Sequence, residues 1–278
     1  MRTMKIVADS SANLKTLPQI NFAIAPLKII TAEREFVDDC NLNVEEMVDF
    51  FHSYKDSSKT SCPNPGDWLE AFGDGDDIFC VTITSGLSGS YNAACVAKQM
   101  YEAENCGKRV FVIDSLSAGP ELVLIIEKLQ ELMAAGCAYE DICRQIGQYT
   151  QKTGLFFALA SLQNFAANGR VPMAVAKVAG LLGIRVVGKD SEQGTLQPVD
   201  KCRGEEKSLK KIVEHLNYDG LRQGKVRIAH CRNESAAQKL MEMIQLEFPE
   251  TDIRISKCLG LCSYYAEEGG LLVGYEKV

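Results

Sequence analysis

Histidine is scarce in this sequence, and that limits the enzymes it can encode. The chain of 278 residues contains only three, His52, His215 and His230. A serine is inert as a nucleophile unless a base lies within hydrogen-bonding reach. His52 and His215 fall on predicted amphipathic helices, so His230, at the end of a predicted strand, is the best available base. A serine-dependent acyl hydrolase using Ser88 and His230 is therefore the enzyme alternative, although GLSG misses the G-x-S-x-G elbow by one position.

Motifs of cofactor and metal enzymes are missing as well. The chain has no Walker A run, no G-x-G-x-x-G fingerprint and no H-E-x-x-H pair. Its eleven cysteines are an odd number at scattered positions, which is typical of reduced thiols. Cys258 and Cys262 come nearest to metal-ligand spacing, but no second pair lies nearby to complete a zinc site. We therefore expect no catalytic residue, no metal and no cofactor.

Long basic runs and long apolar runs are also absent. Asp and Glu outnumber Lys and Arg by 37 to 30, so a nucleic-acid partner is not expected. No apolar stretch is long enough to span a bilayer, and the beginning of the chain reaches Asp9 too soon for the apolar region of a secretion signal. With 46% apolar and 24% charged residues, the composition is that of a globular protein. We expect it in the cytoplasm, with no membrane span.

Apolar, β-branched runs alternate with helical patterns in the first half of the chain. The predicted strands are MKIVA (4–8), FAIAPLKII (22–30), DIFCVTIT (77–84) and VFVID (110–114). Amphipathic helices are predicted over 44–55, from Pro120 to about Gly136, and around 139–150. This alternation predicts an α/β fold with a parallel sheet.

The pattern of residue types changes at Gly154. A buried strand candidate, LFFALASL (155–162), is followed by a glycine-rich region and a hairpin through TLQPVDKCRG. We predict two α/β domains, a parallel-sheet N-terminal domain over 1–153 and a mixed-sheet C-terminal domain over 154–278.

Hydroxyl side chains are concentrated in three loops that follow predicted strands. The loops are DSSAN (9–13), TSGLSGSYN (84–92) and DSLSAG (114–119). Ligands of parallel α/β sheets bind beyond the carboxyl ends of the strands, where these loops would meet. Hydroxyls and glycine-exposed amides, beside the positive end of the helix that begins near Ser90, form a neutral cradle for a carboxylate or phosphate. Each loop alone is explained by capping and turns, but three together favour a binding site.

Arginines and apolar residues in the second half could complete such a site. Arg170 lies in NGRVP and Arg203 in DKCRG, and arginine suits contact with carboxylate or phosphate; solvated loop charges are the alternative. The neighbouring apolar residues would suit a ligand pocket or a domain core equally: Phe156, Phe157, Leu159, Val178, Leu181, Leu182 and Ile184.

Taken together and in order, these segments resemble the DegV family, the fatty-acid-binding proteins that act in bacteria as the lipid-carrying subunit of fatty-acid kinase. The resemblance runs end to end. Its marks are KIVADSSANL, PLKI, KTSCPNPGDW, TSGLSGSYNAA, VFVIDSLSAG, NGRVP, GLLGIRVV and GTLQPVDKCRG. Their order and spacing make the match specific, which no single motif would.

The resemblance implies a non-catalytic carrier with a long-chain fatty acid held between two domains. A separate kinase would phosphorylate the bound fatty acid to an acyl-phosphate that feeds phospholipid synthesis. The positions that inherit carboxylate binding are Thr60, Ser61, Ser85, Gly86, Ser88 and Gly89, and those at the pocket rim or partner contact are Arg170 and Arg203. A binding protein for another small anionic ligand is a further alternative.

The chain departs from the family pattern at three places. Cys62 replaces the usual glutamine of the T-S-Q-P segment, and Asn168 replaces the first glycine of G-G-R. The C-terminal segment LGLCSYYAEEGGLLVGY (259–275) lacks the family's histidine. Tyr264 and Tyr265 are the candidates for a substitute hydroxyl.

Overall fold

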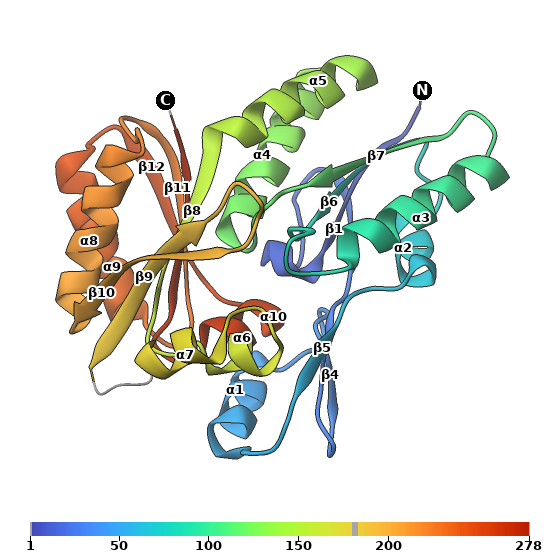
Figure 1. Cartoon of the computed structure of the whole chain (residues 1–278). Helices are drawn as coiled ribbons and strands as arrows, with labels where there is room; N and C mark the ends of the chain where they lie inside the picture. The colour runs from blue at the N-terminus through green and yellow to red at the C-terminus, as the bar shows by residue number, and fades with distance from the viewer. Residues whose placement is uncertain (1, 180–182, 278) are drawn as a thin grey trace.

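A four-stranded parallel sheet, sheet A, forms the core of the first half of the chain. The computed structural model describes residues 2–179 and 183–277 (Figure 1). Sheet A has the order β2-β1-β6-β7, and each neighbouring pair is parallel. Its strands are β1 (Met4–Asp9), β2 (Asn21–Ala25), β6 (Asp77–Thr82) and β7 (Arg109–Asp114). The parallel sheet predicted for the N-terminal half is thus confirmed.

Helices cover both faces of sheet A. One face carries α2 (Pro65–Phe72) and α3 (Ser90–Glu104), and the other carries α4 (Pro120–Ala134) and α5 (Tyr139–Tyr149). Successive residues of β1 point to opposite faces, so Val7 packs with α2 and α3 while Ile6 packs with α4 and α5. Because both faces are buried, the polar residues of these segments collect beyond the strand ends.

The run FAIAPLKII does not form the single strand that its composition predicts. It forms β2 and then, after Pro26, the short strand β3 (Lys28–Ile30) of a second sheet. Proline has no N–H to donate to a strand ladder, which explains the break. This antiparallel sheet B has the order β4-β3-β5, with β4 (Glu35–Val37) and β5 (Lys59–Ser61). Helix α1 (Val44–Ser53) lies between β4 and β5 in sequence, inside the predicted range 44–55.

A six-stranded mixed sheet, sheet C, forms the second half of the chain. Its order is β10-β9-β8-β13-β11-β12, and only the β11–β12 pair is parallel. The strands are β8 (Thr153–Leu159), β9 (Ile184–Asp190), β10 (Leu196–Arg203), β11 (Gly224–His230), β12 (Thr251–Lys257) and β13 (Leu271–Glu276). The predicted mixed sheet is confirmed. The boundary at residues 153 and 154 stays a prediction, although sheet C begins beside it.

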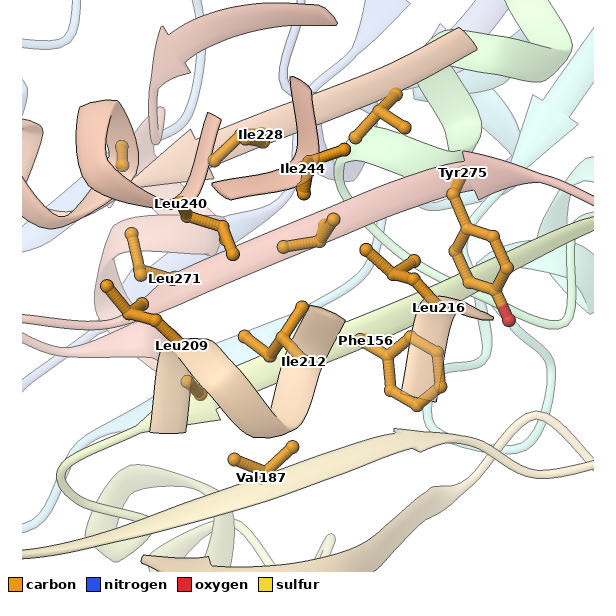
Figure 2. Close-up of a cluster of buried hydrophobic side chains, with 14 of the residues drawn as sticks. Phe156, Val187, Leu209, Ile212, Leu216, Ile228, Leu240, Ile244, Leu271 and Tyr275 are labelled. Atoms are coloured by element: carbon orange, nitrogen blue, oxygen red, sulfur yellow. The ribbon is translucent and has the colours of Figure 1, made fainter. Parts of the chain in front are cut away.

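The two faces of sheet C pack against different parts of the chain. On one face, Figure 2 shows Ile212 of α8 (Glu205–Tyr218) and Leu240 of α9 (Glu234–Glu247) in one buried cluster with Phe156 and Val187 of the sheet. The opposite face carries α6 (Gln163–Ala167), α7 (Met173–Ala179), α10 (Gly260–Ala266) and also α1. Short 3-10 turns at Ser10–Ala12 and Thr150–Lys152 complete the elements. Within the described ranges, no helix is both long and apolar enough to cross a membrane.

Candidate functional site

A cavity of about 310 Å³ lies between sheet A and sheet C. Loops after β1, β6 and β7 form one wall, and β8, β13, α10 and the β9–β10 hairpin form the other. Most of the lining is apolar, including Leu27, Ile83, Leu116, Leu155, Phe157, Leu159, Leu196, Leu261 and Leu272. An apolar cleft between domains, with a few polar groups, is the usual form of a small-molecule site.

Strand β8 supplies the apolar wall through its two-residue periodicity. Leu155, Phe157 and Leu159 line the cavity, while Phe156 and Ala158 belong to the core on the other face of sheet C. The apolar run noted in the sequence therefore serves both a pocket and a domain core. Leu181, Leu182 and the side chain of Val178 lie outside the described residues.

A buried carboxylate, Asp9, joins two of the three hydroxyl-rich loops. It accepts hydrogen bonds from Ser11 Oγ at 2.5 Å, Ser90 Oγ at 2.6 Å and Ile83 N at 2.9 Å. Burial raises the pKa of Asp9, and these hydrogen bonds oppose the shift. Ser11 and Ser90 are thus engaged in holding the loops together. The loops do meet at one sheet edge, but part of their hydroxyl content is structural.

Thr60 belongs to a hydrogen-bonded network at one end of the cavity. Its Oγ1 lies 2.7 Å from Tyr265 Oη, and its backbone N–H donates to Asn168 Oδ1 at 3.1 Å. Asn168 Nδ2 donates to Tyr264 Oη at 2.9 Å, and that hydroxyl also pairs with Ser58 Oγ at 2.6 Å. Of the two tyrosines, Tyr265 lines the cavity, and the ring of Tyr264 packs edge-to-face against it with centroids 4.9 Å apart. Burial raises the pKa of both, so they remain protonated hydroxyls.

Ser88, Gly89 and Arg170 line the same cavity. Ser88 Oγ accepts from Ser90 N at 3.3 Å, and Gly89 occupies the N-cap position of α3 without a side-chain cap. Arg170 Nε donates to Leu87 O at 3.2 Å, and its guanidinium also donates to Asn168 O. A helix N-terminus and a guanidinium both favour an anion, so this end suits a carboxylate or phosphate.

The structure brings together only part of the predicted set. Thr60, Ser61, Ser88, Gly89 and Arg170 line the cavity. Ser61 Oγ donates to Cys62 O at 3.3 Å, so its hydroxyl is already engaged.

Three predicted residues do not line this cavity. Ser85 is exposed, and its backbone N–H donates to Asp114 Oδ1 at 3.0 Å. Arg203 is exposed at the end of β10. Gly86 packs against the β9–β10 hairpin instead of approaching a ligand. Of the six residues predicted to bind a carboxylate, four therefore line the cavity: Thr60, Ser61, Ser88 and Gly89.

The tip of the β9–β10 hairpin closes over the loop that follows β6. Thr84 Oγ1 donates to Gly194 O at 2.9 Å, and Gly194, with φ of +69°, itself lines the cavity. A Cβ atom on Gly86 would collide with Gln193 O, and one on Gly194 would collide with Thr84 Oγ1. We call the Thr84–Gly194 contact with Gly86 beneath it the hairpin latch. The latch was not predicted from the sequence, because a glycine at position 86 does not indicate which segment packs against it.

The proposed Ser88–His230 pair is not assembled. His230 lines a different pocket, with Glu45, Arg232 and Lys257, and its Nδ1 accepts from Asn233 N at 3.2 Å. No histidine is among the described residues around the main cavity. Nor do three His, Cys, Asp or Glu side chains, within residues 2–179 and 183–277, gather as a metal site would require.

Two α/β domains enclosing an apolar cavity with a hydroxyl- and arginine-lined end define a class of ligand-binding proteins. A family model described as "Uncharacterised protein, DegV family" matches residues 3–277. A DegV domain-containing protein of Streptococcus pneumoniae is 43% identical over 278 residues, which is 99% of each chain. This chain belongs to the DegV family, as its sequence motifs indicated.

Solved structures agree in fold along the whole chain. A DegV family protein from Eubacterium eligens, loaded with heptadecanoic acid, superposes with a TM-score of 0.97 at 45% identity. The Streptococcus pneumoniae Fatty Acid Kinase (Fak) B3 protein, loaded with linoleic acid, superposes with a TM-score of 0.97 at 43% identity. Each comparison covers 99% of this chain and 100% of the other. The predicted fold class is confirmed.

Proposed function

We propose that this protein is a non-catalytic carrier that binds a long-chain fatty acid in the cavity between its domains. The observation that carries the proposal is the cavity itself, which is apolar along β8 and ends in hydroxyls beside Arg170. The similar proteins from E. eligens and S. pneumoniae were solved with heptadecanoic acid and linoleic acid, which supports this ligand class.

The apolar walls can supply most of the affinity. Burying about 15 methylenes at roughly 0.8 kcal/mol each contributes about 12 kcal/mol before the costs of association. Micromolar binding needs only about 8 kcal/mol. The polar end therefore has to orient the carboxylate more than it has to hold it.

The polar end keeps hydrogen-bond donors free for a carboxylate. In the Thr60–Tyr265 pair one hydroxyl donates to the other, which leaves one O–H available. Ser88 Oγ only accepts, from Ser90 N, and so can still donate. Arg170 uses part of its five-donor fork on two carbonyl oxygens. We assign carboxylate binding to Thr60, Ser88 and Tyr265, with Arg170 beside them.

The partner that this arrangement suits is a fatty-acid kinase. A carboxylate oxygen held by neutral hydroxyls can attack the γ-phosphoryl group of ATP on the kinase, giving an acyl-phosphate and ADP. The likeness to the Fak B3 protein supports this partnership. We place the protein in the cytoplasm, where its eleven free cysteines would stay reduced. The hydrolase alternative fits less well, because no histidine is among the described residues that line the cavity. The small-anion alternative fits less well, because it does not use the apolar wall.

Lipid extraction tests the proposal. The purified protein is extracted with organic solvent, and the extract is analysed by mass spectrometry for fatty acids. We expect a long-chain fatty acid in the extract, or stoichiometric uptake of added palmitate or oleate by delipidated protein. A clean protein that takes up neither would refute the proposal.

A further inference from the structure

Two buried polar atoms without hydrogen-bond partners lie close together in sequence beside the cavity. Among the described residues, Ser117 Oγ and Glu121 Oε2 are two of the three buried side-chain nitrogen or oxygen atoms that lack a partner. Each residue is 2% exposed. Ser117 lies in the loop before α4, and Glu121 lies in the first turn of that helix. Buried polar groups are normally paired, so two neighbouring exceptions call for a ligand or a water.

The pair lies in the wall between the main cavity and a second, polar pocket. Ser117 lines the main cavity, and Glu121 lines the polar pocket. The two pockets share Leu116, Lys189 and Asp190, so they are separated by a thin wall there. We call the Ser117–Glu121 pair the polar notch. Ser117, Lys189 and Asp190 are polar residues among the mostly apolar side chains that line the main cavity.

The surrounding contacts fix which atoms of the notch are free. Thr153 Oγ1 donates to Glu121 Oε1 at 2.7 Å, so only Oε2 lacks a partner. The backbone of Ser117 is held on both sides, since its N–H donates to Ser115 Oγ at 3.0 Å and its carbonyl accepts from Thr84 N at 2.9 Å. Leu116 is in the left-handed region, with φ of 53°, which fixes the loop further. These contacts hold the Ser117 backbone at the cavity wall.

The buried Glu121 carboxylate is poorly stabilised by its surroundings. Burial raises the pKa of Glu121 to about 7, and the nearby Asp190 carboxylate acts in the same direction. The Ser117 hydroxyl is close enough to oppose this shift, although the two groups do not reach full hydrogen-bond geometry. An oxygen-bearing group in the cavity would let Ser117 accept from it and donate to Glu121.

We infer that the polar notch binds a hydroxyl group carried on the acyl chain, so that the protein prefers a hydroxy fatty acid over the unsubstituted acid of the same length. The inference rests on the proposed fatty-acid binding and specifies its ligand class. The ligand O–H donates to Ser117 Oγ, and the Ser117 O–H donates to Glu121 Oε2. An unsubstituted chain places a methylene against Ser117 and leaves Ser117 Oγ without a donor. A site built to pair a hydroxyl discriminates against a ligand without one.

Binding measurements with positional isomers test the inference. Dissociation constants are measured by displacement of a fluorescent fatty acid, for stearic acid and for stearic acids hydroxylated near the carboxylate, mid-chain and near the methyl end. We expect one isomer to bind about tenfold more tightly than stearic acid, as one added hydrogen bond would give. In Ser117→Ala that ratio falls to about one. Ser256→Ala, at an exposed serine of β12, is the matched control and keeps the ratio.

A ligand-side control avoids dependence on the variant's folding. The O-methyl ether of the preferred isomer cannot donate a hydrogen bond, so wild-type protein should bind it no better than stearic acid. If every hydroxylated isomer binds equally to or more weakly than stearic acid, the notch holds only water and the inference is wrong. If neither stearic acid nor any isomer binds, the proposed function itself fails.

Discussion

The hairpin latch gives a prediction about ligand exchange. Gly86 does not have a positive φ, so alanine there is allowed locally, but its Cβ would collide with Gln193 O and approach Gly194 O to 3.1 Å. Both are backbone atoms, so no side chain can swing aside and the hairpin tip must move. That movement breaks the 2.9 Å hydrogen bond from Thr84 Oγ1 to Gly194 O.

The cost of opening the latch sets the expected effect. A neutral intramolecular hydrogen bond contributes about 0.5–1.5 kcal/mol, so its loss corresponds to roughly a two- to twelvefold change in an equilibrium or rate constant. If the latch encloses the acyl chain, Gly86→Ala should release fatty acid about two- to twelvefold faster, because Gly194, Thr195 and Leu196 no longer close the cavity.

Stopped-flow release of a fluorescent fatty acid into excess unlabelled oleate measures this rate. Gly147→Ala is the matched control, since a Cβ at Gly147, in α5, would meet nothing within 4 Å. A folded Gly86→Ala protein with the wild-type release rate would refute the role of the latch in enclosing the ligand.

Three further predictions concern the polar end of the cavity and the buried carboxyl group of Glu121. Thr60→Ala combined with Ser88→Ala should weaken oleate binding at least about tenfold, at roughly 1 kcal/mol per lost hydrogen bond; titration calorimetry would show unchanged affinity if these hydroxyls do not contact the carboxylate. Tyr265→Phe keeps the ring and removes one hydroxyl, so it should weaken oleate binding several-fold without lowering the unfolding midpoint by more than the loss of one hydrogen bond; a wild-type dissociation constant would contradict its role. The pKa of Glu121 is raised from 4.5 to about 7 in the folded protein, so its contribution to stability is full below about pH 4.5 and is lost as pH rises through 7, by roughly 3 kcal/mol in all. Glu121→Gln removes this pH dependence of stability. In urea unfolding the variant should be more stable than wild type at pH 8 but not at pH 4.5; equal stabilities of the two proteins at both pH values would show that the buried Glu121 charge does not destabilise the wild type.

The layers of the fold could be predicted from the sequence because periodicity reports burial directly. The stripe of α1 and the apolar runs of β1, β6 and β7 indicated helices alternating with a parallel sheet. Sheet B could not be predicted, because its three strands have only three residues each and β5 pairs with β3 from beyond helix α1. The break at Pro26 was visible in the sequence, but an apolar run on both sides of it concealed the change of sheet.

The candidate site could be predicted only where a local motif carries it. Thr60, Ser88 and Arg170 each lie in a short segment with its own pattern, and all three line the cavity. The contact between Thr60 and Tyr265 joins residues 205 apart in sequence, so no spacing rule finds it. The sequence indicated Tyr265 only indirectly. The family carries a histidine in the C-terminal segment, this chain lacks it, and Tyr264 and Tyr265 were the candidates to replace it.

A crystal structure of the protein with oleic acid would test the central claim most directly. We predict the carboxylate within hydrogen-bonding distance of Thr60 Oγ1 and Ser88 Oγ, close to Tyr265 and Arg170, with the acyl chain along Phe157 and Leu155. A carboxylate bound instead at the far wall beside Lys189, or a cavity that stays empty at saturating oleic acid, would contradict it.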